Sequence, residues 1–252
     1  MTITVAQICR YPVKGLNAEP LERVALTEGR ALPNDRRFAI AHGSVTADAA
    51  PGAWQPRRSF LHLAKDEKLA QVRVRFDDES GEMTIERADK PVARGKVTEL
   101  MGRTLVAQFF ASFMAEQLRG APRLVEAAEQ PFTDLDQPYL SIIGLASISD
   151  LERVVREPVD ARRFRANLYL EGSEAWAELG WIGKELQIGG ARLRVEGPID
   201  RCAATNVNPD SAARDLNIPL ALQRGFGHVD MGVYARVVES GEIAQGDVLT
   251  VA

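Results

Sequence analysis

The chain has 252 residues, of which 45% are hydrophobic and 26% charged, and its formal net charge is −4 at pH 7. This composition is ordinary for a globular protein, and the length is enough for two modest domains or one large β-rich unit. The negative charge and the 6% of aromatic residues argue against a nucleic-acid-binding protein. No apolar run is long enough to span a bilayer, so neither nucleic acid nor a membrane is expected as a partner.

The N-terminal residues 1–8 carry no basic region and no cleavage site, and they predict a first β-strand rather than a signal peptide. The two cysteines, Cys9 and Cys202, lie far apart, which excludes a disulfide framework and favours a cytoplasmic location. The three histidines form no His-x-His pattern and no Cys-x-x-Cys motif is present, which argues against a classical zinc site.

Strand patterns dominate the chain. Residues 69–77 alternate between apolar and charged side chains, and the alternation resumes at residue 83 after the turn at residues 78–81, which predicts a hairpin. Before it, residues 45–56 are rich in Ala, Gly and Pro, as is typical of a surface loop.

Helical patterns are fewer. Apolar residues at helical spacing predict a helix over residues 108–118, with Gly120 as its stop. A second helix is predicted over residues 147–157, where the run Ser147-Ile148-Ser149-Asp150 resembles a capping box and Pro158 ends the helix. Residues 211–216 predict a short helical turn.

Two hairpins are predicted in the last third of the chain. Residues 186–188 and 193–195 flank Gly189-Gly190, a pair that can supply the two positive φ angles of a type I′ turn. The other hairpin is expected to join residues 231–238 to residues 248–251.

The predicted fold is therefore mainly β with a few helices (α+β), as a barrel or sandwich pair decorated with helices. The distribution of elements changes between residues 115 and 129, so we place a domain boundary there. The two predicted domains comprise residues 1–115 and 116–252.

Four polar segments carry the candidate chemistry. The side chain of Lys14 follows a turn constrained by Pro12, and Gly15 allows the backbone to approach an anion closely, although a solvated loop lysine fits the same pattern. Two Arg-Arg-Phe runs are less ordinary, because adjacent arginines on a strand face opposite ways and an inward one needs an anionic or carbonyl partner. A structural ion pair and a phosphate site explain these runs equally well. The segments are 11–15, 35–38, 162–167 and 200–205.

Cys202 is the sharpest candidate. A lone cysteine is most often a small buried hydrophobe, and Cys9 fits that role. Arg201 favours the thiolate form of Cys202, whereas the carboxylate of Asp200 opposes it. A Cys–His dyad with His228 stays open, but the chain has no Gly-x-Ser-x-Gly motif and no nucleotide-binding glycine loop.

Taken together and in this order, these segments resemble the MOSC family, named after the C-terminal domain of molybdenum-cofactor sulfurase. Residues 8–40 are similar to the family's N-terminal β-barrel domain, and residues 139–252 to the MOSC domain itself. The hallmarks are Tyr11-Pro12-Val13-Lys14, Asp35-Arg36, Arg163-Phe164-Arg165-Ala166-Asn167, Arg201-Cys202, Asn208-Pro209-Asp210, Gly232-Val233-Tyr234 and Gly246-Asp247.

The resemblance implies an N-terminal β-barrel packed on a MOSC β-barrel, with a pterin-based molybdenum cofactor between the halves. It assigns Cys202 as the catalytic residue and as the thiolate ligand of the metal. This sequence departs from the family at Gly15, where relatives often have serine, and at Asp200, where a small hydroxyl residue is common. The residues implied to hold the cofactor are Lys14, Gly15, Arg36, Arg165, Asn167, Arg201 and Thr205.

By the same resemblance, the protein is expected to reduce small N-hydroxylated or N-oxide substrates with a molybdenum cofactor, a pyranopterin dithiolene. Two cysteines are too few for an iron–sulfur cluster, so a separate protein is expected to donate the electrons. The alternative is a non-enzymatic carrier of the cofactor or of sulfur on Cys202. A barrel without metal is a third hypothesis.

Overall fold

The structure, a computed structural model, describes residues 2–44, 54–127 and 130–252. Most of the loop predicted at residues 45–56 lies outside these residues. The strands are β1 Ile3–Arg10, β2 Glu19–Leu21, β3 Arg23–Leu26, β4 Phe38–Ala41, β5 Val72–Phe76, β6 Glu82–Arg87, β7 Lys90–Lys96, β8 Arg123–Glu126, β9 Leu140–Gly144, β10 Leu168–Glu171, β11 Glu185–Ile188, β12 Ala191–Asp200, β13 Asp230–Glu239, β14 Gly241–Ala244 and β15 Val248–Val251. The α-helices are α1 Leu100–Phe113, α2 Leu145–Val155 and α3 Ile218–Phe226, and the 3-10 turns are η1 Arg57–Ser59, η2 Glu67–Gln71, η3 Ala161–Phe164, η4 Ala177–Trp181 and η5 Ala203–Asn206.

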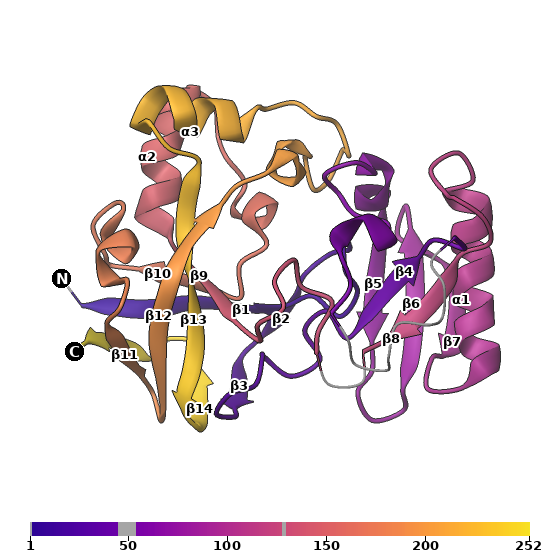
Figure 1. The fold of residues 1–252 in the computed structure, drawn as a ribbon, viewed down its shortest axis with the longest axis horizontal. Helices are drawn as coiled ribbons and strands as arrows, with labels where there is room; N and C mark the ends of the chain where they lie inside the picture. Colours follow the sequence, from indigo (N-terminus) through magenta and orange to yellow (C-terminus); the bar gives the residue numbers. More distant parts are fainter. Residues whose placement is uncertain (1, 45–53, 128–129) are drawn as a thin grey trace.

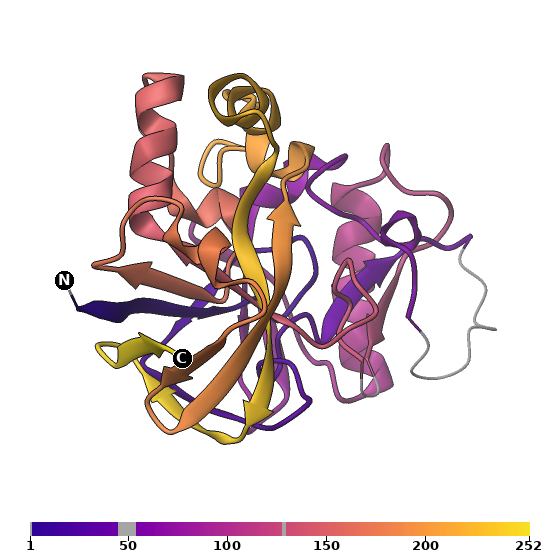
Figure 2. The same cartoon turned by 60° about the vertical axis from the view of Figure 1, so that its left-hand side comes forward.

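A closed barrel forms one half of the molecule (Figure 1). Seven strands make the ring in the order β10-β9-β13-β12-β11-β15-β1, and the pairing of β1 with β10 closes it. Alternate residues of each strand point inward, as in β12, and fill the interior with aliphatic side chains. Helices α2 and α3 pack against each other at one end of the barrel, as Figure 2 shows from a second direction.

The other half is a smaller unit of two sheets and one helix. The sheet β5-β6-β7 packs against α1, while β4 pairs with β8. Its core is separate from that of the barrel and contains Phe38, Met83 and Phe110, all fully buried. The mainly β fold with a few helices is thus confirmed. None of the described helices is long and apolar enough to cross a membrane.

The first strands of the chain belong to the barrel rather than to the smaller unit. Strand β1 pairs with β10 and β15, and β3 pairs with β14. Val5 and Ile8 are buried in the barrel core together with side chains from the C-terminal strands. The division at residue 115 stays a prediction, and the strand pairing shows that the N-terminal residues are shared between the two halves.

The two local hairpins, β5–β6 and β11–β12, are confirmed. Only Gly189 of the Gly189-Gly190 pair has a positive φ, 51°, so the expected type I′ turn is wrong and the pattern is that of type II′. The third hairpin is also wrong: β13 pairs with β12 and β9, whereas β15 pairs with β11 and β1.

The predicted helices exist with shifted bounds. Helix α1 begins at Leu100, which is 82% exposed, so its first turn lacks the amphipathic pattern that marks a helix in the sequence. Helix α2 begins at Leu145, and the hydroxyl of Ser147 donates to buried Glu178 instead of capping the helix. The helical turn expected at residues 211–216 is wrong, because α3 begins at Ile218, where the Asn217 side chain caps it.

Candidate functional site

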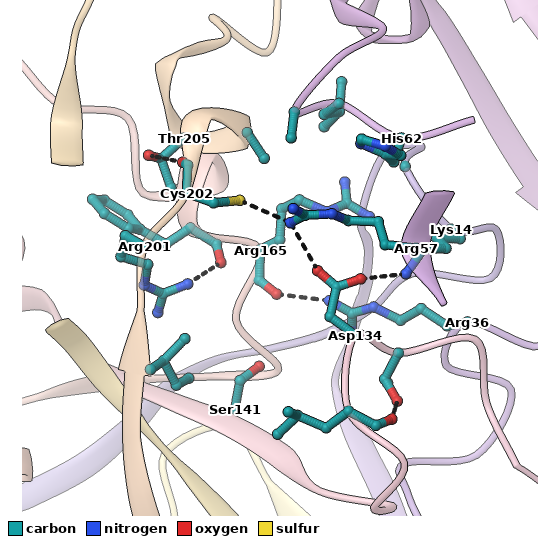
Figure 3. A pocket seen from close by; sticks show the side chains of 18 of the residues that line it. Lys14, Arg36, Arg57, His62, Asp134, Ser141, Arg165, Arg201, Cys202 and Thr205 are labelled. Carbon is teal, nitrogen blue, oxygen red and sulfur yellow. Dashed lines mark hydrogen bonds and ion pairs between the residues drawn. The ribbon is translucent and has the colours of Figure 1, made fainter. Parts of the chain in front are cut away.

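A cavity of about 180 Å³ lies where the barrel meets the smaller unit (Figure 3). Side chains from the loop after β1, from η1, from the loop before β9 and from the end of β12 line it. The structure therefore brings together residues that are far apart in the sequence. All eight residues predicted from the sequence are among those that line it: Lys14, Gly15, Arg36, Arg165, Asn167, Arg201, Cys202 and Thr205.

The cavity is positively charged, although the whole chain is acidic. Six cationic side chains line it, against three carboxylates. Such an excess of cations around a concave site raises the local concentration of anions. The cations are Lys14, Arg36, Arg57, Arg163, Arg165 and Arg201, and the carboxylates are Asp35, Asp134 and Asp200.

Two guanidinium groups lie over one buried aromatic ring. Arg36 and Arg165 place their Cζ atoms 4.2 Å and 4.4 Å from the centre of the Tyr11 ring. Arg36 Nη2 donates to the carbonyl of Arg165 (2.9 Å), and Arg36 Nη1 pairs with Asp35 (2.5 Å). Both arginines have positive φ angles, 48° and 53°, a conformation uncommon for such side chains that brings these two groups to one point.

Arg165 has no carboxylate partner among the residues that the structure describes. Its Nη1 donates to the carbonyl of Leu16, a neutral acceptor. Burial, and next the nearby charge of Arg36, lower the pKa of Arg165 to about 10. A buried cation without a counter-ion is costly, so this group favours an anionic ligand.

Arg201 is a second buried cation of this kind. Its Nε and Nη1 donate to the carbonyls of Met231 and Phe164, each at 2.8 Å. Nη2 is buried and has no hydrogen-bond partner in the part of the chain that the structure describes. Gly232 leaves it room, since a Cβ atom there would lie 3.1 Å from Nη2. Burial lowers the pKa of Arg201.

A chain of contacts connects Lys14 to the thiol of Cys202 (Figure 3). Lys14 Nζ lies 2.5 Å from Asp134 Oδ1, and Arg57 Nη1 lies 3.5 Å from Asp134 Oδ2. The same Nη1 donates to Cys202 Sγ at 3.4 Å. Burial alone would raise the pKa of Asp134, but the ion pair with Lys14 and the charge of Arg57 lower it, so Asp134 stays ionised.

Cys202 sits between the end of β12 and η5. Its carbonyl accepts from the amide of Thr205 (3.1 Å) and from the Thr205 hydroxyl (2.9 Å), which fixes the backbone that carries the thiol. The cysteine is half-buried, with its sulfur on the cavity wall. Thr205 therefore positions the Cys202 backbone. The role of Thr205 in binding a cofactor stays a prediction.

Two other polar residues of the site use their hydrogen-bonding groups to connect separate segments of the chain. The side chain of Asn167 accepts from Ser141 and donates to the carbonyl of Cys9, so it joins β9 to β1. Arg163 pairs with Asp215 at 2.7 Å and donates to the carbonyl of Asn206. Of the two alternatives left open for the Arg-Arg-Phe runs, the structural ion pair describes Arg36, Arg37 and Arg163, which pair with Asp35, Glu126 and Asp215. A phosphate site at these runs stays a prediction.

His228 does not line the cavity that contains Cys202; it packs against Trp176 and Phe226, so it is not placed as a base for this thiol. His62 does line the cavity, and burial lowers its pKa. Sequence reasoning missed His62, Arg57 and Asp134, because each is an isolated polar residue in a loop without a motif. Within the described residues, no group of three or more His, Cys, Asp and Glu could hold a metal ion.

Gly15 occupies a position that a larger residue cannot enter freely. Its φ is 82°, and a Cβ atom would lie 3.1 Å from the Leu69 side chain and 3.4 Å from the Leu61 carbonyl. We expect Gly15→Ala to lower the free energy of unfolding by about 1–2 kcal/mol, because strain and crowding add. Chemical denaturation measures this.

The matched control is Gly29→Ala. Gly29 has a similar φ of 68°, but nothing lies within 4 Å of its Cβ position. This variant carries the backbone strain without the crowding, so it should be the milder of the two. Equal losses of unfolding free energy in both variants would show that crowding at Gly15 adds nothing to the backbone strain.

Comparison with known proteins finds two family models that match consecutive parts of the chain. The family model of the MOSC N-terminal beta barrel domain matches residues 2–132, and that of the MOSC domain matches residues 129–250. Mitochondrial amidoxime-reducing component 1 of Mus musculus is 24% identical over 97% of this chain and 81% of its own length. Mitochondrial amidoxime reducing component 2 of Bos taurus is 28% identical over 97% of this chain and 82% of its own length.

Molybdenum cofactor sulfurase of Drosophila yakuba is 31% identical over 90% of this chain, which spans only 31% of that longer protein. The crystal structure of the YUAD protein from Bacillus subtilis aligns with 100% of this chain and 96% of its own, at 11% identity and a TM-score of 0.47. The matches of the two domain models, which together span nearly the whole chain, show that the protein belongs to the MOSC family.

Proposed function

We propose that the cavity binds a molybdenum-bearing pterin cofactor and that the protein uses it to reduce N-hydroxylated or N-oxide compounds. The observation that carries the proposal is a pair of cations, half-buried Arg165 and buried Arg201, which have no carboxylate partner among the described residues and line the same cavity as the Cys202 thiol. A phosphate-bearing ligand would supply the missing counter-charge.

The residues present fit such a ligand. Arg165 and the unpaired Nη2 of Arg201 offer donors to anionic oxygens, while Lys14 and Arg36 add positive charge. The soft thiolate of Cys202 suits a metal that already has sulfur ligands. When bound, the cofactor would supply a metal centre for two-electron oxygen-atom-transfer chemistry.

The overall reaction consumes two electrons and two protons: R–NH–OH becomes R–NH₂ and water. A separate donor protein would supply the two electrons. The chain's own part is to orient the substrate beside Cys202, in the cavity between the barrel and the smaller unit.

The names of the relatives support this proposal in different degrees. Two of them are amidoxime-reducing components that align along most of their length, which favours a reductase. The sulfurases support the alternative, a carrier of cofactor or sulfur. Walls drawn from both halves of the chain favour slow release, which is the opposite of what a carrier needs. A cytoplasmic location stays a prediction.

The test begins with protein produced in a host that makes the cofactor. We expect molybdenum and pterin in amounts close to one per chain, and reduction of benzamidoxime to benzamidine with a chemical reductant. Transfer of the cofactor to a cofactor-free molybdoenzyme is timed in parallel. Rapid transfer without any reduction would favour the carrier and overturn the reductase.

A further inference from the structure

We propose that Arg57 binds a carboxylate of the substrate, so that the preferred substrates are N-oxygenated compounds that carry a carboxylate. This inference rests on the proposed reductase and adds the substrate class to it. Arg57 belongs to η1 of the smaller unit, yet it reaches across the cavity to the barrel residue Cys202 (Figure 3).

Arg57 differs in exposure from the other cations of the cavity. Its side chain is 42% exposed, whereas those of Lys14 and Arg163 are 8% and 3% exposed. The residues Arg36, Arg165 and Arg201 are all half-buried or buried. A dissolved substrate can therefore reach Arg57 before it reaches the other charges.

Most of the donor capacity of Arg57 is unused. Both of its contacts, to Cys202 and to Asp134, go through Nη1. Nε and Nη2 make no hydrogen bond to any residue that the structure describes. These two groups form the side of the guanidinium that binds a carboxylate through two parallel hydrogen bonds.

Asp134 does not neutralise Arg57. Its Oδ1 lies 2.5 Å from Lys14 Nζ, whereas its Oδ2 is 3.5 Å from Arg57. The Lys14 ion pair is the shorter contact, and one carboxylate faces two cations. The second cation therefore keeps a net attraction for another anion.

The position of Arg57 also limits the size of the substrate. Its Nη1 is 3.4 Å from the Cys202 sulfur, so a carboxylate bound at Nε and Nη2 lies only a few bond lengths from the proposed metal ligand. The N–O group and the carboxylate would then be separated by a short spacer. A benzene ring substituted at meta positions has about this span.

The experiment compares three amidoximes with the metal-loaded protein and a chemical reductant: benzamidoxime, its meta-carboxy derivative and its meta-carboxamide derivative. The carboxamide matches the carboxylate in size without the charge. We expect kcat/KM for the carboxylate to exceed that for the carboxamide about tenfold or more, mainly through a lower KM. The advantage should shrink as salt is added.

Three variants test whether the preference for a carboxylate depends on the Arg57 side chain. Arg57→Ala should lower kcat/KM for the carboxylate substrate to that for the carboxamide, and Arg57→Lys should restore part of the difference. Arg58→Ala is the matched control, since Arg58 is an exposed neighbour that does not line the cavity. Because meta-carboxybenzamidine has no N–O bond to reduce, calorimetric titration measures its binding without turnover. Its affinity should be lowest for Arg57→Ala, intermediate for Arg57→Lys and unchanged for Arg58→Ala.

The outcomes separate this inference from the proposed function. If none of the amidoximes is reduced but meta-carboxybenzamidine binds in an Arg57-dependent manner, the reductase fails and the anion site stands. If all three are reduced equally well, or if Arg57→Ala weakens the neutral and charged compounds alike, the reductase stands and the anion site is wrong.

Discussion

Replacing Cys202 with serine is expected to abolish reduction of N-hydroxylated substrates and to change the electronic spectrum of the bound metal. A hydroxyl is a harder ligand than a thiolate and is a poor match for a metal with sulfur ligands. The protein should still fold, because Cys202 is half-buried and its sulfur contacts only Arg57 among the described polar groups. Steady-state rates, the absorption spectrum and thermal unfolding measure the three effects.

The matched control is the other cysteine, Cys9→Ala. Cys9 is buried in an apolar cluster with residues of α2 and α3. Burial raises the pKa of its thiol to about 11, so Cys9 is not a thiolate at neutral pH. This variant should lose about 1 kcal/mol of stability and keep the spectrum. A Cys202→Ser protein with an unaltered spectrum and full activity would falsify the assignment of the ligand.

Replacing Arg165 with methionine is expected to weaken cofactor retention by roughly tenfold to a hundredfold, because one charged hydrogen bond contributes about 1.5–3 kcal/mol. The cofactor-free protein should lose little stability. The variant gives up one hydrogen bond to Leu16, but it also removes a buried cation that lies close to Arg36. Dialysis followed by metal analysis measures retention, and chemical denaturation measures stability.

Arg163→Met is the contrasting variant. Arg163 lines the same cavity, but its charge is used in the ion pair with Asp215 and in hydrogen bonds to backbone carbonyls. We expect a stability loss of about 1.5–3 kcal/mol with retention nearly unchanged. If both variants lose the cofactor equally, the distinction between an anion-binding and a structural arginine is wrong.

The sequence predicted the elements whose partners are neighbours in the chain. The hairpins β5–β6 and β11–β12 combine alternating side chains with a short turn, and both pieces of information are local. Strands over residues 231–238 and 248–251 were also predicted, but the pairing expected between them was wrong. Strand β15 joins β11 and β1, and nothing in the alternation of a strand names a distant partner.

The same limit applies to the site. The sequence predicted Arg36, Arg165 and Cys202 as site residues because they lie in short polar runs that resemble a known family. Arg57 and Asp134 belong to no such run, and only the folded chain shows that they contact each other. The structural ion pair of Arg163 was also hidden, because its partner Asp215 lies far along the chain.

The closure of the barrel has a consequence for the order of events during synthesis. Strand β1 is synthesised before the strands on either side of it, β10 and β15, which follow much later along the chain. The barrel therefore cannot close until β15 has been synthesised. Until then Val5 and Ile8 lack their final neighbours, and the unpaired edges of β1 are open to pairing with other strands.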